Sequence, residues 1–149
     1  PCNLYGPGDY FHPTRSHVIP ALLQRFHDAA QNKVPTVTCW GSGTPRREFM
    51  HVDDVAEACG FLLRTYSGEG HLNIGAGSEI TIRELAEEIA CVTGFKGDIA
   101  WDTTKPDGTM LKRMDVSRIG ALGWKARIGF REGLEATYRW FLQQPALRT

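Results

Sequence analysis

Short runs of β-branched and aromatic residues alternate with amphipathic segments along most of this 149-residue chain. β-branched and aromatic side chains favour strands, whereas apolar residues repeated every three or four positions favour helices. We therefore expect strands at residues 36–40, 48–52, 71–74 and 98–102, and helices at 17–30, 55–65, 82–93, 116–122 and 130–143. Strands that alternate with helices are typical of an α/β protein.

Local signals indicate where several helices begin. Residues 81–84 (TIRE) have the spacing of a capping box for the helix at 82–93, and Gly94 is suited to end that helix. We expect Ser16 to cap the first helix and Asp53 or Asp54 to cap the second. We interpret these two aspartates as helix caps and not as a pair of catalytic acids.

Composition excludes several classes of function. The 17 Lys and Arg residues balance the 17 Asp and Glu residues, which argues against a nucleic-acid-coating protein. No apolar run approaches the ~20 residues that span a bilayer, so no membrane segment is expected. The four cysteines lie far apart and form no CxxC pair. They favour reduced thiols in a cytoplasmic protein over a disulfide framework or a metal site.

Two glycine-rich turns resemble a dinucleotide fingerprint only in part. Residues 41–43 (GSG) and 75–77 (GAG) both lack the third glycine of GxGxxG, and no Walker A motif is present. We therefore expect the main pyrophosphate-binding loop of any dinucleotide to lie outside this chain. The chain starts at Pro1 without Met, and its strands are few. We expect a piece of a longer protein, in which some elements complete a sheet formed elsewhere.

Several motifs together resemble a known family. Residues 3–7 (NLYGP), 40–49 (WGSGTPRREF), 51–54 (HVDD) and 122–124 (LGW) are similar to the C-terminal half of extended short-chain dehydrogenases that act on nucleotide sugars. Two more stretches, residues 9–20 (DYFHPTRSHVIP) and 105–108 (KPDG), narrow the resemblance to GDP-L-fucose synthases. The resemblance extends from Pro1 to about residue 142.

The resemblance implies a Rossmann-type enzyme that uses NADPH. It would convert GDP-4-keto-6-deoxy-D-mannose to GDP-L-fucose by 3,5-epimerisation and reduction of the 4-ketone. Residues 1–149 would form the substrate-binding C-terminal domain, with elements near 1–8 and 49–75 completing the absent cofactor domain. The reductase Ser, Tyr and Lys would also lie upstream, so the chain alone should be inactive. Members of the family are commonly homodimers.

His17 is the candidate acid/base. It lies in the first turn of its predicted helix, where the helix dipole disfavours imidazolium and favours a neutral ring. A neutral imidazole can give or take a proton, as chemistry at carbons beside a ketone requires. Position alone leaves a capping or surface role open. The resemblance implies that His17 works with an upstream cysteine at C3 and C5 of the sugar.

The resemblance places four side chains at the substrate: Arg25, Trp40, Arg47 and Asp107. Arg25 follows His17 by eight residues, which is roughly 12 Å along nearly the same helix face. That offset suits a hexose at one end and a diphosphate at the other. A solvated charge is the alternative for Arg25, and core packing is the alternative for Trp40.

Arg47 and Asp107 have chemistry that fits a nucleoside diphosphate. A guanidinium can bind a diphosphate through paired hydrogen bonds, while the neighbouring Arg46 is expected to face solvent. The Asp107 carboxylate could accept hydrogen bonds from N1–H and the 2-amino group of guanine. An aspartate in a Pro-Asp-Gly turn can also have a purely local role.

The cofactor contacts implied by the resemblance are Pro1, Cys2, Asn3 and Leu4, whose backbone would lie beside the nicotinamide of NADPH. Two other functions stay open. The chain could belong to another nucleotide-sugar epimerase or dehydratase, which UDP or dTDP ligands would separate from a GDP-dependent enzyme. It could also be a sugar-nucleotide-binding module without catalytic activity, which would be consistent with the absence of the cofactor loop.

Overall fold

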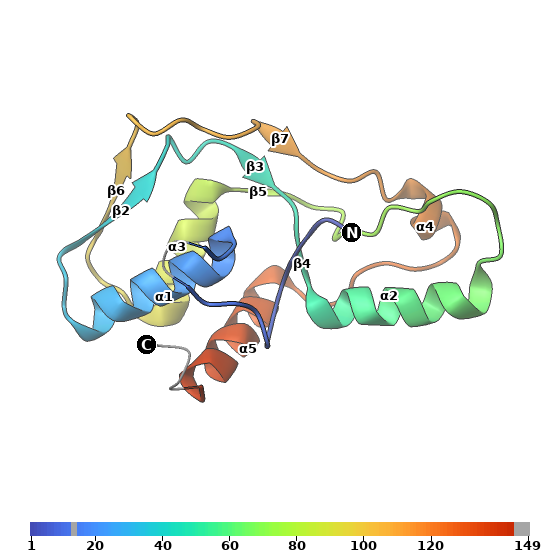
Figure 1. Cartoon of the computed structure of the whole chain (residues 1–149), viewed down its shortest axis with the longest axis horizontal. Helices are drawn as coiled ribbons and strands as arrows, with labels where there is room; N and C mark the ends of the chain where they lie inside the picture. Colours follow the sequence, from blue (N-terminus) through green and yellow to red (C-terminus); the bar gives the residue numbers. More distant parts are fainter. Residues whose placement is uncertain (13–14, 145–149) are drawn as a thin grey trace.

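The computed structural model describes residues 1–12 and 15–144, and it shows an α/β fold in which short strands and helices alternate (Figure 1). The strands are β1 (Asn3–Tyr5), β2 (Thr36–Trp40), β3 (Arg46–Arg47), β4 (Phe49–His51), β5 (Ile80–Thr81), β6 (Asp98–Asp102) and β7 (Leu111–Lys112). The helices are α1 (Val18–Gln31), α2 (Val52–Thr65), α3 (Ile82–Thr93), α4 (Ser117–Ala121) and α5 (Phe130–Leu142). The predicted fold class is confirmed. Pro13, at the end of the DYFHP stretch, lies outside the described residues.

The strands form three small sheets. β1 pairs in parallel with β4, and β2 pairs in parallel with β6. The third sheet has the order β5-β3-β7, in which β3 is antiparallel to β5 and parallel to β7. Since parallel neighbours need a crossover connection, each parallel pair brings together segments that are distant in the sequence.

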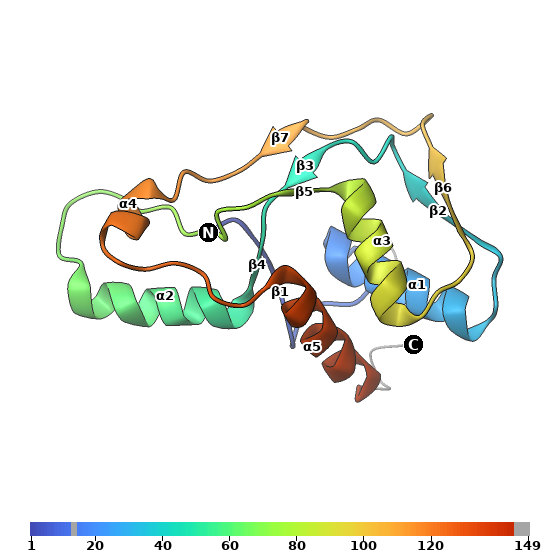
Figure 2. The same ribbon diagram turned by 180° about the vertical axis from the view of Figure 1, so that it is seen from behind.

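Two buried clusters correspond to the two ends of the molecule. In both views α2 and α4 lie at one end and α1, α3, β2 and β6 at the other, with β1 and β4 between them (Figures 1 and 2). Phe49 belongs to the cluster built on α1, α3 and α5, whereas the next residue, Met50, belongs to the cluster beneath α2 and α4. Successive strand residues face opposite sides, so β4 contributes to both cores. None of the described helices is long and apolar enough to cross a membrane.

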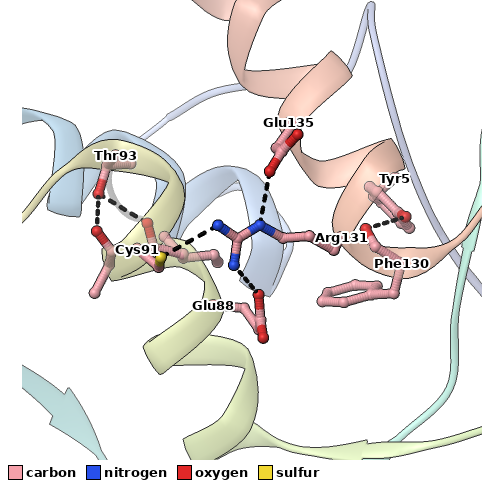
Figure 3. Close-up of polar contacts among 9 residues, drawn as sticks. Tyr5, Glu88, Cys91, Thr93, Phe130, Arg131 and Glu135 are labelled. Carbon is pink, nitrogen blue, oxygen red and sulfur yellow. Dashed lines mark hydrogen bonds and ion pairs between the residues drawn. The ribbon is translucent and has the colours of Figure 1, made fainter.

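The start of α5 is tied to β1 on one side and to α3 on the other. The Tyr5 hydroxyl donates a hydrogen bond to the carbonyl of Phe130 (3.1 Å). Arg131 donates to three side chains of α3 and α5 at 2.6 to 3.2 Å, namely Glu88, Glu135 and Cys91 (Figure 3). These bonds fix the strand β1, which leads into the candidate site.

Local sequence signals predicted α3 correctly. The Thr81 hydroxyl accepts a hydrogen bond from the Glu84 backbone N–H (3.0 Å), and the Glu84 carboxylate accepts one from the Thr81 N–H (2.6 Å). Gly94 ends the helix with a left-handed φ of 73°. The capping box and the glycine stop are therefore confirmed, as are the bounds of β2 and β6.

The prediction that Ser16 caps the first helix was wrong. His17 occupies the N-cap position of α1, and its side chain makes no capping hydrogen bond. The Ser16 hydroxyl instead donates to the carbonyl of His12 and accepts from the His12 N–H. Serine readily bonds to nearby backbone groups in this way, which competes with helix capping.

The prediction that Asp53 or Asp54 caps the second helix was also wrong. α2 begins earlier, with His51 at the N-cap, where its Nδ1 accepts from the Asp53 N–H (3.3 Å). Asp54 is buried, and its carboxylate accepts from the backbone N–H groups of Arg127 (3.1 Å) and Ile128 (3.0 Å). The Asp54 side chain therefore holds the segment before α5, in which Arg127 lies 73 residues further along the chain.

Other differences concern short strands. Residues 71–74 form no strand, although the Ile74 carbonyl accepts from the Cys2 N–H (2.9 Å). The strand predicted at 48–52 is shorter, as β4. The two-residue strands β3, β5 and β7 were not predicted because they are too short to show a period of two.

Glu48, between β3 and β4, has no exposed surface. Its carboxylate accepts from the backbone N–H groups of Gly77 (2.8 Å) and Met114 (2.7 Å), and its carbonyl accepts from the Asn3 side chain (3.0 Å). Burial of a carboxylate is costly unless such bonds compensate for lost hydration. Glu48 thus joins three segments at the centre of the fold.

We expect Glu48→Ala to lower the free energy of unfolding by ~2–4 kcal/mol, because it leaves two backbone N–H groups without an acceptor. The exposed Glu87 on α3 supplies the matched control, and Glu87→Ala should change stability by less than about 0.5 kcal/mol. Chemical denaturation of both variants measures the difference. Equal stability of the two variants would contradict the role assigned to Glu48.

Candidate functional site

A cavity of about 480 Å³ lies where β1 leads into the loop before α1. Its lining includes Cys2, Asn3, Leu4 and His17. The structure therefore brings the predicted acid/base next to most of the predicted cofactor segment. Pro1 lies beside a smaller cavity of about 120 Å³, which shares Cys2 and Asn3 with the first and is also lined by Lys112.

His17 is placed by the helix start. As the N-cap residue of α1 it has extended backbone angles, and its carbonyl accepts from the Ala21 N–H (3.0 Å). Its side chain is exposed and lines the cavity. The apolar walls opposite include Ile19, Phe49 and Val52. The start of α1 thus places the imidazole beside a largely apolar hollow, where it can exchange protons with a ligand.

Cys2 also lines this cavity, and its thiol differs from the His17 imidazole in its ability to exchange protons. Burial, followed by the nearby charge of Glu48, raises the pKa of the Cys2 thiol to about 11. The thiol therefore stays protonated near neutral pH, whereas the reactive form of a cysteine is the thiolate. Cys2 can line and shape the cavity, but it is not set up as a nucleophile.

A second group of predicted residues meets at the turn after β2. The Asp107 carboxylate accepts from the backbone N–H of Ser42 (2.9 Å) and from its hydroxyl (2.7 Å). Those bonds hold the pKa of Asp107 below its usual value, so the group is ionised at neutral pH. Gly41 has a φ of 80°, and a Cβ there would lie 2.3 Å from an Asp107 oxygen. Only glycine allows this approach.

Trp40 lies beside this turn and is not a core residue. Its side chain is 68% exposed, because it lies on the exposed face of β2, whose opposite face buries Val37 and Cys39. The Lys105 ammonium lies 5.9 Å from the ring centroid. An exposed aromatic face next to a cation and a carboxylate is suited to stack on a planar ligand such as a nucleobase.

Arg47 connects the two groups. Its guanidinium donates to the carbonyls of Arg46 (2.8 Å) and Thr109, which holds it against the 107–109 loop. In the β3-β7 pairing Arg47 lies opposite Lys112. Arg46 points elsewhere and forms an ion pair with Glu79 (3.7 Å). Sequence reasoning missed Lys112 because the strand that sets this register is only two residues long.

Arg25 lies apart from both cavities that contain Cys2. It is half-buried in the middle of α1 and donates to the carbonyl of Thr38 on β2 (3.1 Å). An open hollow of about 280 Å³ adjoins it, lined also by Asp28 and Asn32. The strand that Arg25 contacts carries Trp40 two residues further on. The sequence predicted five side chains for one site. The geometry supports a place in that site less for Arg25 than for the other four.

Comparison with known proteins identifies the family of the chain. The model of the NAD dependent epimerase/dehydratase family matches residues 1–75. The chain is 57% identical to GDP-L-fucose synthase 1 of Arabidopsis thaliana, with 96% of this chain and 44% of that protein aligned. It is 51% identical to GDP-L-fucose synthase of Escherichia coli (strain K12), covering 96% of this chain and 47% of that protein.

Solved structures show the same fold. A GDP-L-fucose synthetase from Naegleria fowleri bound to NADP superposes with a TM-score of 0.89 at 28% identity, over 95% of this chain and 45% of that one. The chain thus spans less than half the length of the relatives that it matches. The family model covers half of the chain, and the β1-α1-β4 arrangement belongs to that half. The chain therefore belongs to the NAD dependent epimerase/dehydratase family.

Proposed function

We propose that this chain is the substrate-binding part of an NADPH-dependent GDP-L-fucose synthase, which converts GDP-4-keto-6-deoxy-D-mannose to GDP-L-fucose. One observation carries the proposal: the cavity at the end of β1 is lined both by His17 and by the segment 2–4. An acid/base and a cofactor-contacting segment must meet in this way for epimerisation and reduction to share one sugar. The names of relatives 51–57% identical to the chain support the substrate.

The residues that line the cavity fit a nicotinamide. Phe49 and Val52 give it an apolar wall, and Cys2, Asn3 and Leu4 add a stretch of backbone along one side. A flat ring with an amide group can pack on such a wall and bond to backbone groups. The residues that would hold the ring are thus Cys2, Asn3 and Leu4, with Pro1 beside the adjoining smaller cavity. NADPH, when bound, supplies the hydride that reduces the C4 ketone.

His17 would move the protons at C3 and C5. Both carbons adjoin the C4 ketone, which makes their hydrogens removable by a positioned base. The exposed ring beside the cavity can reach one face of a sugar bound there. Inversion at each carbon would need a second acid/base group on the opposite face. The upstream half would contribute the partner cysteine and the reductase residues.

The nucleotide would lie toward the Gly41–Thr44 turn. Arg47 and Lys112 are neighbours in the pairing of β3 with β7 and offer two cations for a diphosphate. Arg25 would add a third cation from α1. Trp40 and Asp107 would bind the base, one by its exposed ring and the other by its ionised carboxylate.

Residues near 1–8 and 49–75 would complete the cofactor domain. β1 and β4 form a parallel sheet of two strands, whereas parallel sheets are normally larger and covered on both faces. One face of α2 packs against the core through Ala58. A second apolar row on the helix is exposed and ends at Leu63, whose side chain is 88% exposed. A helix that is apolar on two sides is typical of an inner layer. The homodimer and the cytoplasmic location stay predictions for the whole protein.

The test of His17 uses the complete enzyme, with the upstream half included. We expect His17→Asn to lower the turnover of GDP-4-keto-6-deoxymannose by about 10²–10⁴-fold, the usual contribution of general acid–base catalysis. Exchange of solvent deuterium into C3 and C5 should fall by the same factor. NADPH loss and NMR of the sugar measure the two effects.

The matched control for this experiment is His71→Asn, because His71 is exposed and lines none of the three cavities described above. That variant should keep wild-type turnover. A folded wild-type enzyme that turns over UDP- or dTDP-sugars but no GDP-sugar would contradict the proposed function. Normal exchange in His17→Asn would contradict the role of His17 alone.

A separate prediction concerns the two cations Arg47 and Lys112. We expect Arg47→Ala and Lys112→Ala each to weaken GDP binding by about 10- to 100-fold, since each removes a charge-assisted hydrogen bond to phosphate. Arg46→Ala is the control, because its side chain pairs with Glu79 on the exposed surface, and such pairs contribute little. Calorimetric titration with GDP measures all three. Weakening by Arg46→Ala to the same degree would show that general charge, not this strand pairing, determines affinity.

A further inference from the structure

A tight turn at the end of β1 places Asp9 beside the candidate site. The Asp9 N–H donates to the carbonyl of Gly6 (3.3 Å), which closes a turn with Pro7 and Gly8 in the middle. Proline at the second position and glycine with a positive φ at the third are typical of a type II turn, and Gly8 has a φ of 86°. The local sequence therefore fixes Asp9, which is half-buried, in the lining of the cavity of about 480 Å³.

One oxygen of the Asp9 carboxylate is available to a ligand. Oδ1 accepts from the Tyr10 N–H (2.7 Å), whereas Oδ2 makes no hydrogen bond to the described part of the chain. An ionised carboxylate is an acceptor only, with about four lone-pair positions. Oδ2 can therefore take a hydrogen bond from a donor in the cavity while the bond to Tyr10 stays intact.

Asp9 is the one acidic residue among the described residues that line this cavity. Two other polar side chains of the lining are tied to the protein. Asn3 donates to the carbonyl of Glu48 (3.0 Å), and Tyr5 donates to the carbonyl of Phe130 (3.1 Å). A largely apolar pocket orients its ligand through a few such polar groups. Asp9 thus offers the charged acceptor for a hydroxyl group of a bound ligand.

The chemistry of the proposed substrate indicates which hydroxyl group this is. The hexose of GDP-4-keto-6-deoxymannose has free hydroxyls at C2 and C3, because C1 carries the nucleotide, C4 is a ketone and C6 is a methyl group. A ketone oxygen accepts hydrogen bonds and cannot donate one to a carboxylate. C3 inverts during the reaction, which moves its hydroxyl, whereas C2 keeps its configuration throughout. A fixed carboxylate can therefore hold the C2 hydroxyl in substrate, intermediate and product.

We propose that Asp9 is a sugar-binding residue, whose carboxylate accepts a hydrogen bond from the C2 hydroxyl of the hexose. The inference rests on the proposed function, since it takes the ligand to be this GDP-sugar. It goes further in giving the hexose a binding group on the turn after β1, separate from the acid/base His17. A bond that is equally strong in the ground state and in the transition state lowers KM and leaves kcat unchanged. Asp9 would thus determine the affinity for the sugar and not the rate.

The test compares Asp9→Asn with the control Asp115→Asn in the complete enzyme. Asparagine keeps an oxygen for the Tyr10 N–H and removes the charge. We expect Asp9→Asn to raise the KM for GDP-4-keto-6-deoxymannose about tenfold, the usual effect of one hydrogen bond to a charged group. Its kcat and its KM for NADPH should stay within about twofold. Asp115 accepts from the Ser117 N–H (2.9 Å), is exposed and lines none of the three cavities, so Asp115→Asn should match wild type.

A substrate analogue that lacks the C2 hydroxyl tests the contact itself. The 2-deoxy analogue should have a KM about tenfold higher with the wild-type enzyme. Asp9→Asn should raise that KM no further, because the variant and the analogue remove the same bond. The measurement on the wild-type enzyme needs no substitution, so it tests the inference even where Asp9→Asn misfolds.

Four results would overturn the inference. The wild-type enzyme could have the same KM for both sugars, Asp9→Asn could keep the wild-type KM, or the effects of the variant and the analogue could add. A fall in kcat and in deuterium exchange in Asp9→Asn, with KM unchanged, would assign Asp9 to proton transfer instead. A folded wild-type enzyme that turns over no GDP-sugar would overturn the proposed function itself.

Discussion

The buried carboxylate of Glu48 sets the positions of three segments on which the candidate site depends. A carboxylate without water must find its hydrogen bonds inside the protein, and Glu48 finds them at Gly77 and Met114. Gly75 allows this approach, because a Cβ there would lie 2.3 Å from a Glu48 oxygen. The segment that ends in Met114 includes β7, so the place of Lys112 beside Asn3 in the smaller cavity depends on the hydrogen bond between Glu48 and Met114.

Three consecutive residues at this point face three different regions. Arg47 points toward the 107–109 loop, Glu48 into the interior, and Phe49 into the larger core and the His17 cavity. Alternation along a strand gives only two directions. The third arises because Glu48 interrupts the strands, between the end of β3 and the start of β4. The junction of β3 and β4 therefore joins the predicted nucleotide side of the site to the predicted sugar side, and a shift of one residue there would disturb both.

The sequence predicted those features whose causes are local. The capping box at Thr81 depends on neighbours within a few residues. β2 and β6 were found with their bounds from their own runs of β-branched and aromatic residues, although they pair with each other across the sequence. The roles of Asp54 and Glu48 could not be predicted, since their hydrogen-bond partners lie 73 and 66 residues away. Among the candidate site residues, His17 and the segment 1–4 were predicted from motifs, and the structure places His17 and residues 2–4 around one cavity. Lys112 was missed because only strand pairing places it opposite Arg47.

The direction of β1 and β4 explains how two halves of a protein could share one site. The two strands are parallel, so their carboxyl ends meet at the same edge, and residues 6–9 after β1 and Val52 after β4 line the cavity there. In α/β sheets ligands bind outside the carboxyl ends of the strands. Further parallel strands added to this sheet would end at the same edge. A dinucleotide held by their loops would then run along the edge toward His17, which lies at the start of α1.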